Sequence, residues 1–219
     1  TNTTSRDNVG LGFCALHANT TGSRNAASGS LALDSNTTAC DNTATGYKAL
    51  YANTTGAANT AIGNLAGSNV TTGGNNLLLG LDAGRSGTPS GEITTQSNRI
   101  SLGNNSITNA YIRVDWTVTS DLRDKMNIEP ISHGLDFVNQ LNPIKFNFKK
   151  SRENATSHGR KKYGFKAQDI LALEGEDNVI IDNEDPNSLK YIGSHLVPVL
   201  VNAIKELKAR IEVLENEWS

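Results

Sequence analysis

Hydrophobic residues in positions 1–92 recur at a fixed interval of 17 residues, between polar stretches rich in Asn, Thr and Gly. Each interval opens with an asparagine, which is followed four residues later by glycine and seven residues later by alanine. The opening residues are Asn8, Asn25, Asn42, Asn59 and Asn76. An interval of this length is too short for a helical hairpin and too long for one strand. It predicts one coil of a β-solenoid, with two short strands and two turns per coil.

The repeated polar positions predict how neighbouring coils contact one another. Stacked Asn and Thr side chains are expected to form hydrogen-bonded ladders, and the recurring Gly residues permit turns with positive φ. The apolar stripe is narrow, because it consists mainly of Ala with some Leu or Ile. We therefore expect three chains to wind together around one shared core of small residues. A single-chain solenoid and a disordered Asn/Thr tract are the alternatives.

A change of pattern marks residues 93–119 as a connector. Residues 97–104 resemble a degenerate copy of the repeat that is out of phase with the others. Apolar and polar residues then alternate, with Ile112, Val114, Trp116 and Val118 on one face. This alternation predicts a β-strand over 110–119, with Trp116 as a core anchor.

A heptad pattern dominates the end of the chain. Apolar residues step alternately by three and four positions at Val197, Leu200, Ile204, Leu207, Ile211, Leu214 and Trp218. The pattern predicts a helix over 194–217, capped by Ser194, with Pro198 tolerated in its first turn. The helix either packs on its own domain or forms a coiled coil. Ile at a with Leu at d nominally favours two strands.

Between these regions the chain is charged and free of repeats, which indicates a small α/β (α+β) domain over 120–219. A helix is expected over 133–141, a strand over 144–148 after Pro143, and a further strand over 179–181. The basic stretch 149–162 is expected to be a loop or hairpin tip, with His158 in the loop. It is either a solvated loop or an arm that holds other chains.

Composition excludes several classes of function. The net charge of −2 gives no reason to expect nucleic-acid binding, and no apolar run is long enough for a membrane span. Two cysteines do not make a disulfide framework, and the histidines lack metal-ligand spacing. We therefore expect no cofactor or metal. Because the sequence begins at Thr1, we expect it to be the C-terminal piece of a longer protein.

The junction at residues 119–128 carries the candidate chemistry. Ser120 and Asp121 are good helix caps, and from composition alone capping is the simpler interpretation. The alternative is a catalytic pair, in which Lys125 removes the proton of the Ser120 hydroxyl. A serine needs such a base, and a lysine can serve only when it is uncharged. At this spacing the two side chains meet only if the chain hooks between them, or if Lys125 comes from a neighbouring protomer.

Three motifs in order resemble the self-cleaving intramolecular chaperone domains at the C-termini of phage endosialidases, tail fibres and neck appendages. The first is Ser-Asp-x-Arg-x-Lys-x-Asn-Ile at 120–128. The second is the Pro-containing strand at 141–149, and the third is Tyr-Gly-Phe-Lys-Ala-Gln-Asp-Ile at 163–170. Lys166 departs from the apolar residue that the family often has there. The resemblance covers about residues 96–219.

The resemblance implies an autocatalytic serine endopeptidase, with Ser120 as nucleophile and Lys125 as base. Thr119, Asp121 and Gln168 are the expected supporting or cleavage-site residues. The cut lies at Ser120, on its Thr119 side or its Asp121 side. The implied protein is a homotrimeric tail fibre or appendage of a virion, assembled in the host cytoplasm. Its chaperone part is released after cleavage, and its upstream fibre contacts a host-cell surface receptor.

Two other functions remain open from the sequence. The first is a permanent structural or adhesive trimeric fibre whose C-terminal domain stays attached. The remaining alternative is a hydrolase that acts on other proteins, although no second catalytic constellation supports it. The domains expected for all these functions are a shaft over 1–92, a connector over 93–119 and a chaperone domain over 120–219.

Overall fold

The computed structural model describes residues 5–86, 88–113, 115–150, 152–175 and 178–218. The chain divides into two compact units. The first contains residues 1–110 together with 149–158, and the second contains residues 111–148 and 159–219. Each unit is described by itself below.

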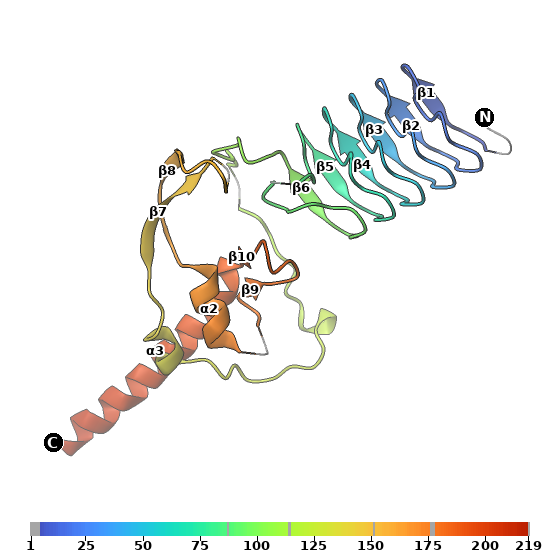
Figure 1. Ribbon diagram of the computed structural model, residues 1–219. Coiled ribbons are helices and arrows are strands. Elements are labelled where there is room, and N and C mark those ends of the chain that lie inside the picture. The colour runs from blue at the N-terminus through green and yellow to red at the C-terminus, as the bar shows by residue number, and fades with distance from the viewer. Residues whose placement is uncertain (1–4, 87, 114, 151, 176–177, 219) are drawn as a thin grey trace. The chain divides into compact units, whose positions relative to one another are not determined.

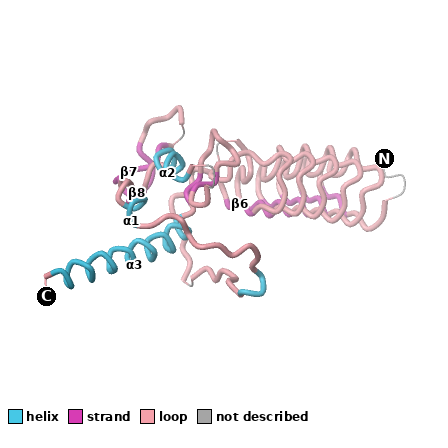
Figure 2. Tube along the Cα trace, turned by 90° about the horizontal axis from the view of Figure 1, so that it is seen from below, coloured by secondary structure: helices cyan, strands magenta, loops and turns pink. Residues whose placement is uncertain are grey.

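The first unit contains a β-solenoid with 17-residue repeats. Six short strands form one parallel sheet in chain order (Figures 1 and 2). The strands are β1 (Val9–Leu11), β2 (Ala26–Ser28), β3 (Thr43–Thr45), β4 (Thr60–Ile62), β5 (Leu77–Leu79) and β6 (Ile100–Leu102). From β1 to β5 each residue pairs with the residue 17 positions later, for example Ala27 with Ala44. Each coil of the described chain has one strand, where we expected two.

The sixth strand extends the solenoid into the segment expected to be a connector. Leu78 of β5 pairs with Ser101 of β6, so this last interval is 23 residues long instead of 17. The additional residues are accommodated outside the sheet, and Ile93 among them is buried in the solenoid core. The out-of-phase repeat at 97–104 is therefore a further coil of the same solenoid.

The apolar stripe closes on itself within one chain. Its side chains are at most 1% exposed and form one continuous cluster: Ala27, Ala32, Leu33, Ala44, Ala49, Leu50, Ala61, Ala66, Val70, Leu78, Ala83 and Ile93. Small residues suffice because the coil is narrow and backbone passes on every side of them. Our expectation that this stripe needs two further chains to cover it is therefore wrong.

The predicted polar ladders are confirmed. The Oδ1 atom of each opening asparagine accepts the backbone N–H of the next one, as between Asn25 and Asn42 at 3.0 Å. A second ladder joins the side chains of Asn36 and Asn19 at 2.8 Å. The hydroxyl of Thr37 donates to the carbonyl of Thr54 at 3.1 Å. These bonds satisfy buried amides that would otherwise destabilise the narrow core.

The strand expected over 110–119 is absent from the described residues 110–113 and 115–119. Trp116 is 76% exposed and is not a core anchor, and Ile112 and Val118 are also exposed. Val114, the fourth residue of the expected apolar face, lies outside the described residues. A lone strand has no partner for its backbone groups, so alternation of side chains alone does not create one.

The second unit is a small α/β domain. Its elements are the 3-10 turn η1 (Leu122–Asp124), α1 (Leu135–Val138), β7 (Ile144–Lys149), β8 (Ser157–Gly164), α2 (Ala167–Glu174), β9 (Ile181–Asp182), β10 (Lys190–Tyr191) and α3 (Gly193–Glu217). The last residue of β7 and the first two residues of β8 fall in the first unit. β7 pairs with β8, and β9 pairs with β10. Part of the expected loop over 149–162 is therefore strand β8, and His158 lies in that strand. The expected strand over 179–181 is displaced to Ile181–Asp182.

A small core holds this unit together. Phe137, Ile170, Ile180, Ile181, Leu196 and Val199 form its buried cluster. The buried carboxylate of Glu174 accepts backbone N–H bonds from Val179 at 2.7 Å and from Ile181 at 3.0 Å. The start of α1 is held on α3, because the Glu206 carboxylate accepts the N–H of Leu135 at 2.7 Å.

Helix α3 has two apolar faces with different surroundings. Leu196, Val199 and Ala203 are buried against the domain. The heptad residues Val197, Leu200, Ile204, Leu207, Ile211, Leu214 and Trp218 are all exposed. Ser194 lies inside the helix, and Ile192 occupies the capping position without a side-chain cap, so the expected serine cap is wrong. No helix in the described residues is long and apolar enough to cross a membrane.

Candidate functional site

The site is built on a tight turn at the start of the second unit. Asp121 is extended and caps η1, where its carboxylate accepts the backbone N–H of Arg123 at 2.9 Å. The N–H of Lys125 then donates to the carbonyl of Leu122 at 3.1 Å, and Lys125 is again extended. An extended residue on each side of one 3-10 turn reverses the side-chain direction. The chain therefore hooks between Ser120 and Lys125.

The hook brings the two candidate catalytic side chains together. The Nζ atom of Lys125 donates a hydrogen bond to the Oγ atom of Ser120 at 2.8 Å. Both residues come from one chain, so the pair does not require a neighbouring protomer. This distance lies within the range for direct proton transfer between a nucleophile and its base. Asp121 both caps the turn and leaves Ser120 available, so capping and catalysis are compatible.

Arg123 is a residue whose position in the site we did not predict. Its guanidinium makes two hydrogen bonds to the Asp121 carboxylate, at 3.0 and 2.6 Å. The side-chain bonds from Arg123, followed by the bond from its backbone N–H, lower the pKa of Asp121. The same contact raises the pKa of Arg123. The two-residue spacing of Asp and Arg around a capped turn was the signal that could have indicated this clamp.

The turn is open to solvent in the single chain. Ser120 and Lys125 are exposed, and so are the apolar neighbours Leu122, Met126 and Ile128, with Met126 82% exposed. In the single chain the Lys125 amine donates to the Ser120 hydroxyl. Catalysis requires the reverse arrangement, in which the hydroxyl donates.

The other predicted site residues lie at different distances from this pair. Thr119 precedes Ser120 directly and is exposed. Gln168 is exposed in the first turn of α2, and among the contacts of the described residues none joins it to Ser120 or Lys125. Asp169 contacts Lys166 at 3.4 Å. The motif around Gln168 therefore begins α2, while the contact between Ser120 and Lys125 depends on the turn alone.

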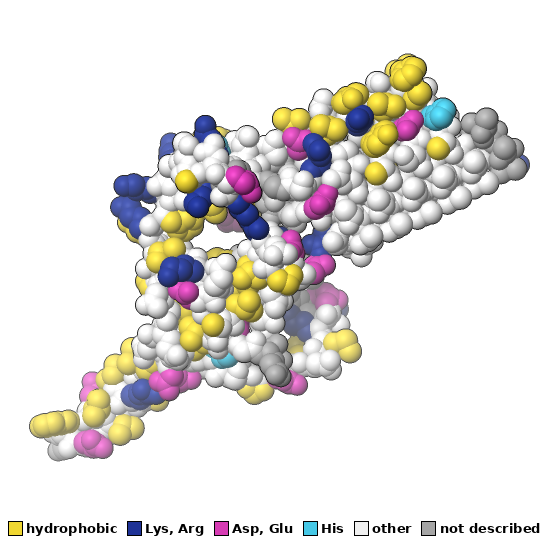
Figure 3. All heavy atoms as spheres, viewed as in Figure 1, with side chains coloured by type: hydrophobic (Ala, Val, Ile, Leu, Met, Phe, Trp, Pro, Cys, Tyr) yellow, Lys and Arg dark blue, Asp and Glu magenta, His cyan; other side chains and the backbone are white. Residues whose placement is uncertain are grey.

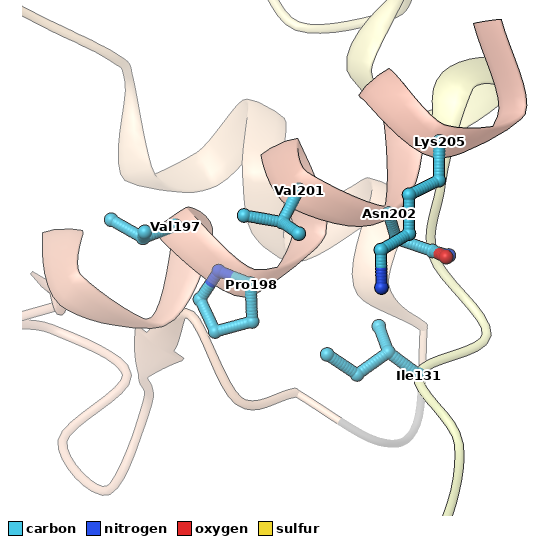
Figure 4. Close-up of a pocket in the computed structure, with 6 residues that line it drawn as sticks. All are labelled: Ile131, Val197, Pro198, Val201, Asn202 and Lys205. Atoms are coloured by element: carbon cyan, nitrogen blue, oxygen red, sulfur yellow. The ribbon is translucent and has the colours of Figure 1, made fainter. Parts of the chain in front are cut away.

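A pocket on α3 offers no alternative catalytic site. Ile131, Val197, Pro198, Val201, Asn202 and Lys205 line it, as Figure 4 shows. Its walls are mainly aliphatic, and the lining contains no Ser, Cys, His or carboxylate that could act as nucleophile or base. Within the described residues, no group of His, Cys, Asp and Glu side chains is arranged to hold a metal ion. The Ser120–Lys125 pair is therefore the candidate site.

Comparison with known protein families agrees with this location. Residues 120–180 match the model of a peptidase family described as chaperone of endosialidase. The match begins at Ser120 and includes η1, α1, the β7–β8 pair and α2. No curated protein and no solved structure matches the chain. Together with the β-solenoid that precedes it, the match identifies residues 120–180 as a tail-fibre or tailspike chaperone domain of the chaperone-of-endosialidase family.

Proposed function

We propose that this chain is the C-terminal part of a phage tail fibre or appendage, which assembles as a homotrimer and then cuts itself at Ser120. The observation that carries the proposal is the 2.8 Å contact between Lys125 Nζ and Ser120 Oγ, at the first residue of the family match. The solenoid is the part that stays in the virion. The residues from Ser120 onward are the chaperone that leaves.

The proposed reaction is an N-to-O acyl shift followed by hydrolysis. An uncharged Lys125 amine takes the proton of the Ser120 hydroxyl, and Oγ attacks the carbonyl carbon of Thr119. The Thr119–Ser120 C–N bond breaks, and the lysine returns the proton to the Ser120 nitrogen. Water then hydrolyses the Thr119 ester and releases a carboxylate and the free hydroxyl. Attack on the preceding carbonyl passes through a five-membered ring, whereas attack of Ser120 on its own carbonyl requires a four-membered ring.

Assembly of three chains would supply the water-free surroundings that the Lys125 amine lacks in the isolated chain. The pair is surrounded by exposed apolar side chains, among them Leu122, Met126 and Ile128. Covering these residues would remove water from the amine and favour its uncharged form. Cleavage before assembly would separate the shaft from its chaperone too early. The exposure of the pair in one chain therefore supports a reaction that waits for the trimer.

The exposed heptad face of α3 is the proposed trimerisation element. One face of α3 already packs on its own domain, and the seven heptad residues remain available for other copies. A repetitive shaft needs such an element, because a slip of one coil loses only one coil's contacts. Joining three chains at one end raises their effective concentration and sets the starting register. Removal of the chaperone then leaves a shaft with no easy route to unfold.

Cleavage is tested by a denaturing gel of the expressed chain. The wild type is expected to yield two pieces, residues 1–119 and 120–219, while Ser120→Ala and Lys125→Ala stay whole. Lys125→Arg is the matched control for charge, since arginine keeps a cation but cannot act as a base. Mass spectrometry of the new C-terminus identifies the broken bond. Cleavage that persists in Ser120→Ala or Lys125→Arg would reject the pair.

Assembly is tested separately in the uncut Ser120→Ala protein. Ile204→Glu combined with Ile211→Glu is expected to convert a trimer into monomers in sedimentation analysis, because charges at heptad positions oppose helix association. Val213→Glu places a charge on an exposed aliphatic residue off the heptad face and is expected to keep the trimer. A stable trimer that is never cut would favour the permanent adhesive fibre instead. Turnover of an added peptide would favour a hydrolase acting on other proteins.

A further inference from the structure

The outer face of the solenoid sheet differs from the rest of the solenoid surface. In each three-residue strand from β2 to β6 the middle side chain is buried and the two flanking side chains point outward. With the corresponding residues of β1, the outward side chains are Val9, Leu11, Ala26, Ser28, Thr43, Thr45, Thr60, Ile62, Leu77, Leu79, Ile100 and Leu102. All twelve are uncharged, and most are aliphatic. We call this surface the outer sheet face.

The charged residues of the solenoid lie elsewhere on each coil. Within residues 5–86 and 88–104 they are Arg6, Asp7, Arg24, Asp34, Asp41, Lys48, Asp82, Arg85, Glu92 and Arg99. Some of them bridge neighbouring coils, as Arg24 does with Asp41 at 2.6 Å. A large exposed surface without charge commonly marks a site of association with another protein chain. An outer sheet face without charge over six coils is therefore unprotected against association.

Aliphatic side chains on this face are open to solvent in the single chain. Leu11 is 69% exposed, Ile100 is 69% exposed and Leu102 is 54% exposed. Figure 3 shows hydrophobic side chains gathered along part of the solenoid surface, with some Lys or Arg, Asp or Glu and His side chains among them. The solenoid core is already filled by its own buried stripe. These outer aliphatic residues are therefore not needed to hold one coil on the next, and burial against a partner would stabilise them.

The sizes of the outer residues change along the shaft. The outer residues are large in β1, small in β2 and β3, and large again in β5 and β6. Two identical outer sheet faces place large residues beside large ones, and small residues beside small ones, only when each coil lies beside the corresponding coil of the other chain. A slip of one coil would place Leu77 beside Thr60 and leave a void. The outer sheet face thus carries register information along the shaft.

We propose that the outer sheet face packs against the same face of two further copies of this chain, side by side and in register. This proposal rests on the proposed homotrimer and assigns the surface by which its shafts associate. The partner that packs on this face is a second copy of the chain. Its identical face is also uncharged, and its outward side chains follow the same order of large and small residues along the shaft. The chaperone domain brings such copies together at the junction. A charged partner would find no complementary group on this face.

Cysteine cross-linking in the full-length Ser120→Ala protein tests the proposal. Cys14 and Cys40 are first replaced by serine. Thr45→Cys then places a thiol on the outer sheet face, and Thr55→Cys places one on an exposed turn of the same coil. A short bis-maleimide is expected to link Thr45→Cys chains efficiently into covalent dimers. Linking of Thr55→Cys chains is expected to be at least tenfold weaker.

The outcomes separate this proposal from the proposed function. One outcome is a protein that is a trimer by native mass and yet links equally through both positions, or only through Thr55→Cys. That result would reject packing through the outer sheet face but not the proposed trimer. A monomer by native mass overturns both. As a second variant, Ile62→Glu is expected to lower the melting temperature of the cleaved shaft, whereas Thr55→Glu leaves it unchanged. Equal melting temperatures for these two variants would also overturn the assignment.

Discussion

The solenoid and the C-terminal unit solve the problem of burial in opposite ways. The solenoid fills its interior with small side chains from one chain, and backbone and amide ladders join every coil to the next. The C-terminal unit buries a small cluster and leaves large apolar residues in solvent, including Trp116, Met126 and the heptad face of α3. Repetition lets one chain close its own core. The irregular unit retains the surfaces that other copies can cover.

The two units also differ in the sequence distance over which contacts form. Solenoid contacts join residues 17 positions apart, so a coil can add to the coil before it. The C-terminal unit joins distant segments, as between Leu135 and Glu206, which are 71 positions apart. Long loops must close before such contacts form, and this slows folding. The part that we propose starts assembly is therefore the part with the more demanding topology.

The largest expected difference between the units comes from two Gly→Ala substitutions. Gly46 has a φ of 129°, and a methyl group there would overlap the carbonyl of Gly63 in the next coil. We expect Gly46→Ala to cost about 3 kcal/mol, because neither backbone can move without breaking the ladder. Gly175 also has positive φ, at 72°, but a methyl group would meet open space. Gly175→Ala is expected to cost about 2 kcal/mol from backbone strain alone, because its ψ of −134° lies outside the left-handed helical region.

Thermal unfolding followed by circular dichroism, on the uncut Ser120→Ala protein, measures both substitutions. The solenoid transition should shift in Gly46→Ala only, and the transition of the C-terminal unit should shift in Gly175→Ala only. Equal shifts of one shared transition would mean that the two units do not unfold independently. The contrast between a repetitive and an irregular unit would then need revision.

A smaller effect is expected from the asparagine ladder. Asn42→Ala removes the Oδ1 atom that accepts the buried N–H of Asn59 at 2.9 Å. An unsatisfied buried donor costs about 1–3 kcal/mol. Asn64 provides the matched control, since its side chain is exposed and its φ is not positive. Chemical denaturation should show a clear loss for Asn42→Ala and little change for Asn64→Ala.

The smallest effect on stability is expected from lowering the pH. Each unit has an exposed Asp–Arg pair, and contact with arginine lowers the pKa of Asp41 and of Asp121. A lowered pKa contributes stability above the ordinary value of about 3.9, and this contribution is lost as the pH falls through the lowered value. Both pairs are solvent-exposed, so the melting temperature should change little. NMR titration should show the turn at 121–125 opening in acid, with no such step in Asp121→Asn.

Much of the solenoid could be predicted because its information is local and repeated. The interval of 17 residues, the ladders and the long C-terminal helix all follow from residues that recur at fixed positions. The strand at 110–119 was wrongly predicted, since alternation does not supply a strand partner. The pairing of Ser120 with Lys125 was conditional on a hook. The 3-10 turn and the clamp from Arg123 to Asp121 provide that hook.

The sequence by itself determined that a repetitive solenoid precedes an irregular domain, and that a serine and a lysine stand at their junction. Only the tertiary structure decided that the narrow apolar stripe is enclosed within one chain. It also decided which faces of α3 and of the sheet remain exposed. The reason is that periodicity identifies residues that share a face, whereas burial depends on what lies opposite that face. Only the coordinates of the folded chain reveal this.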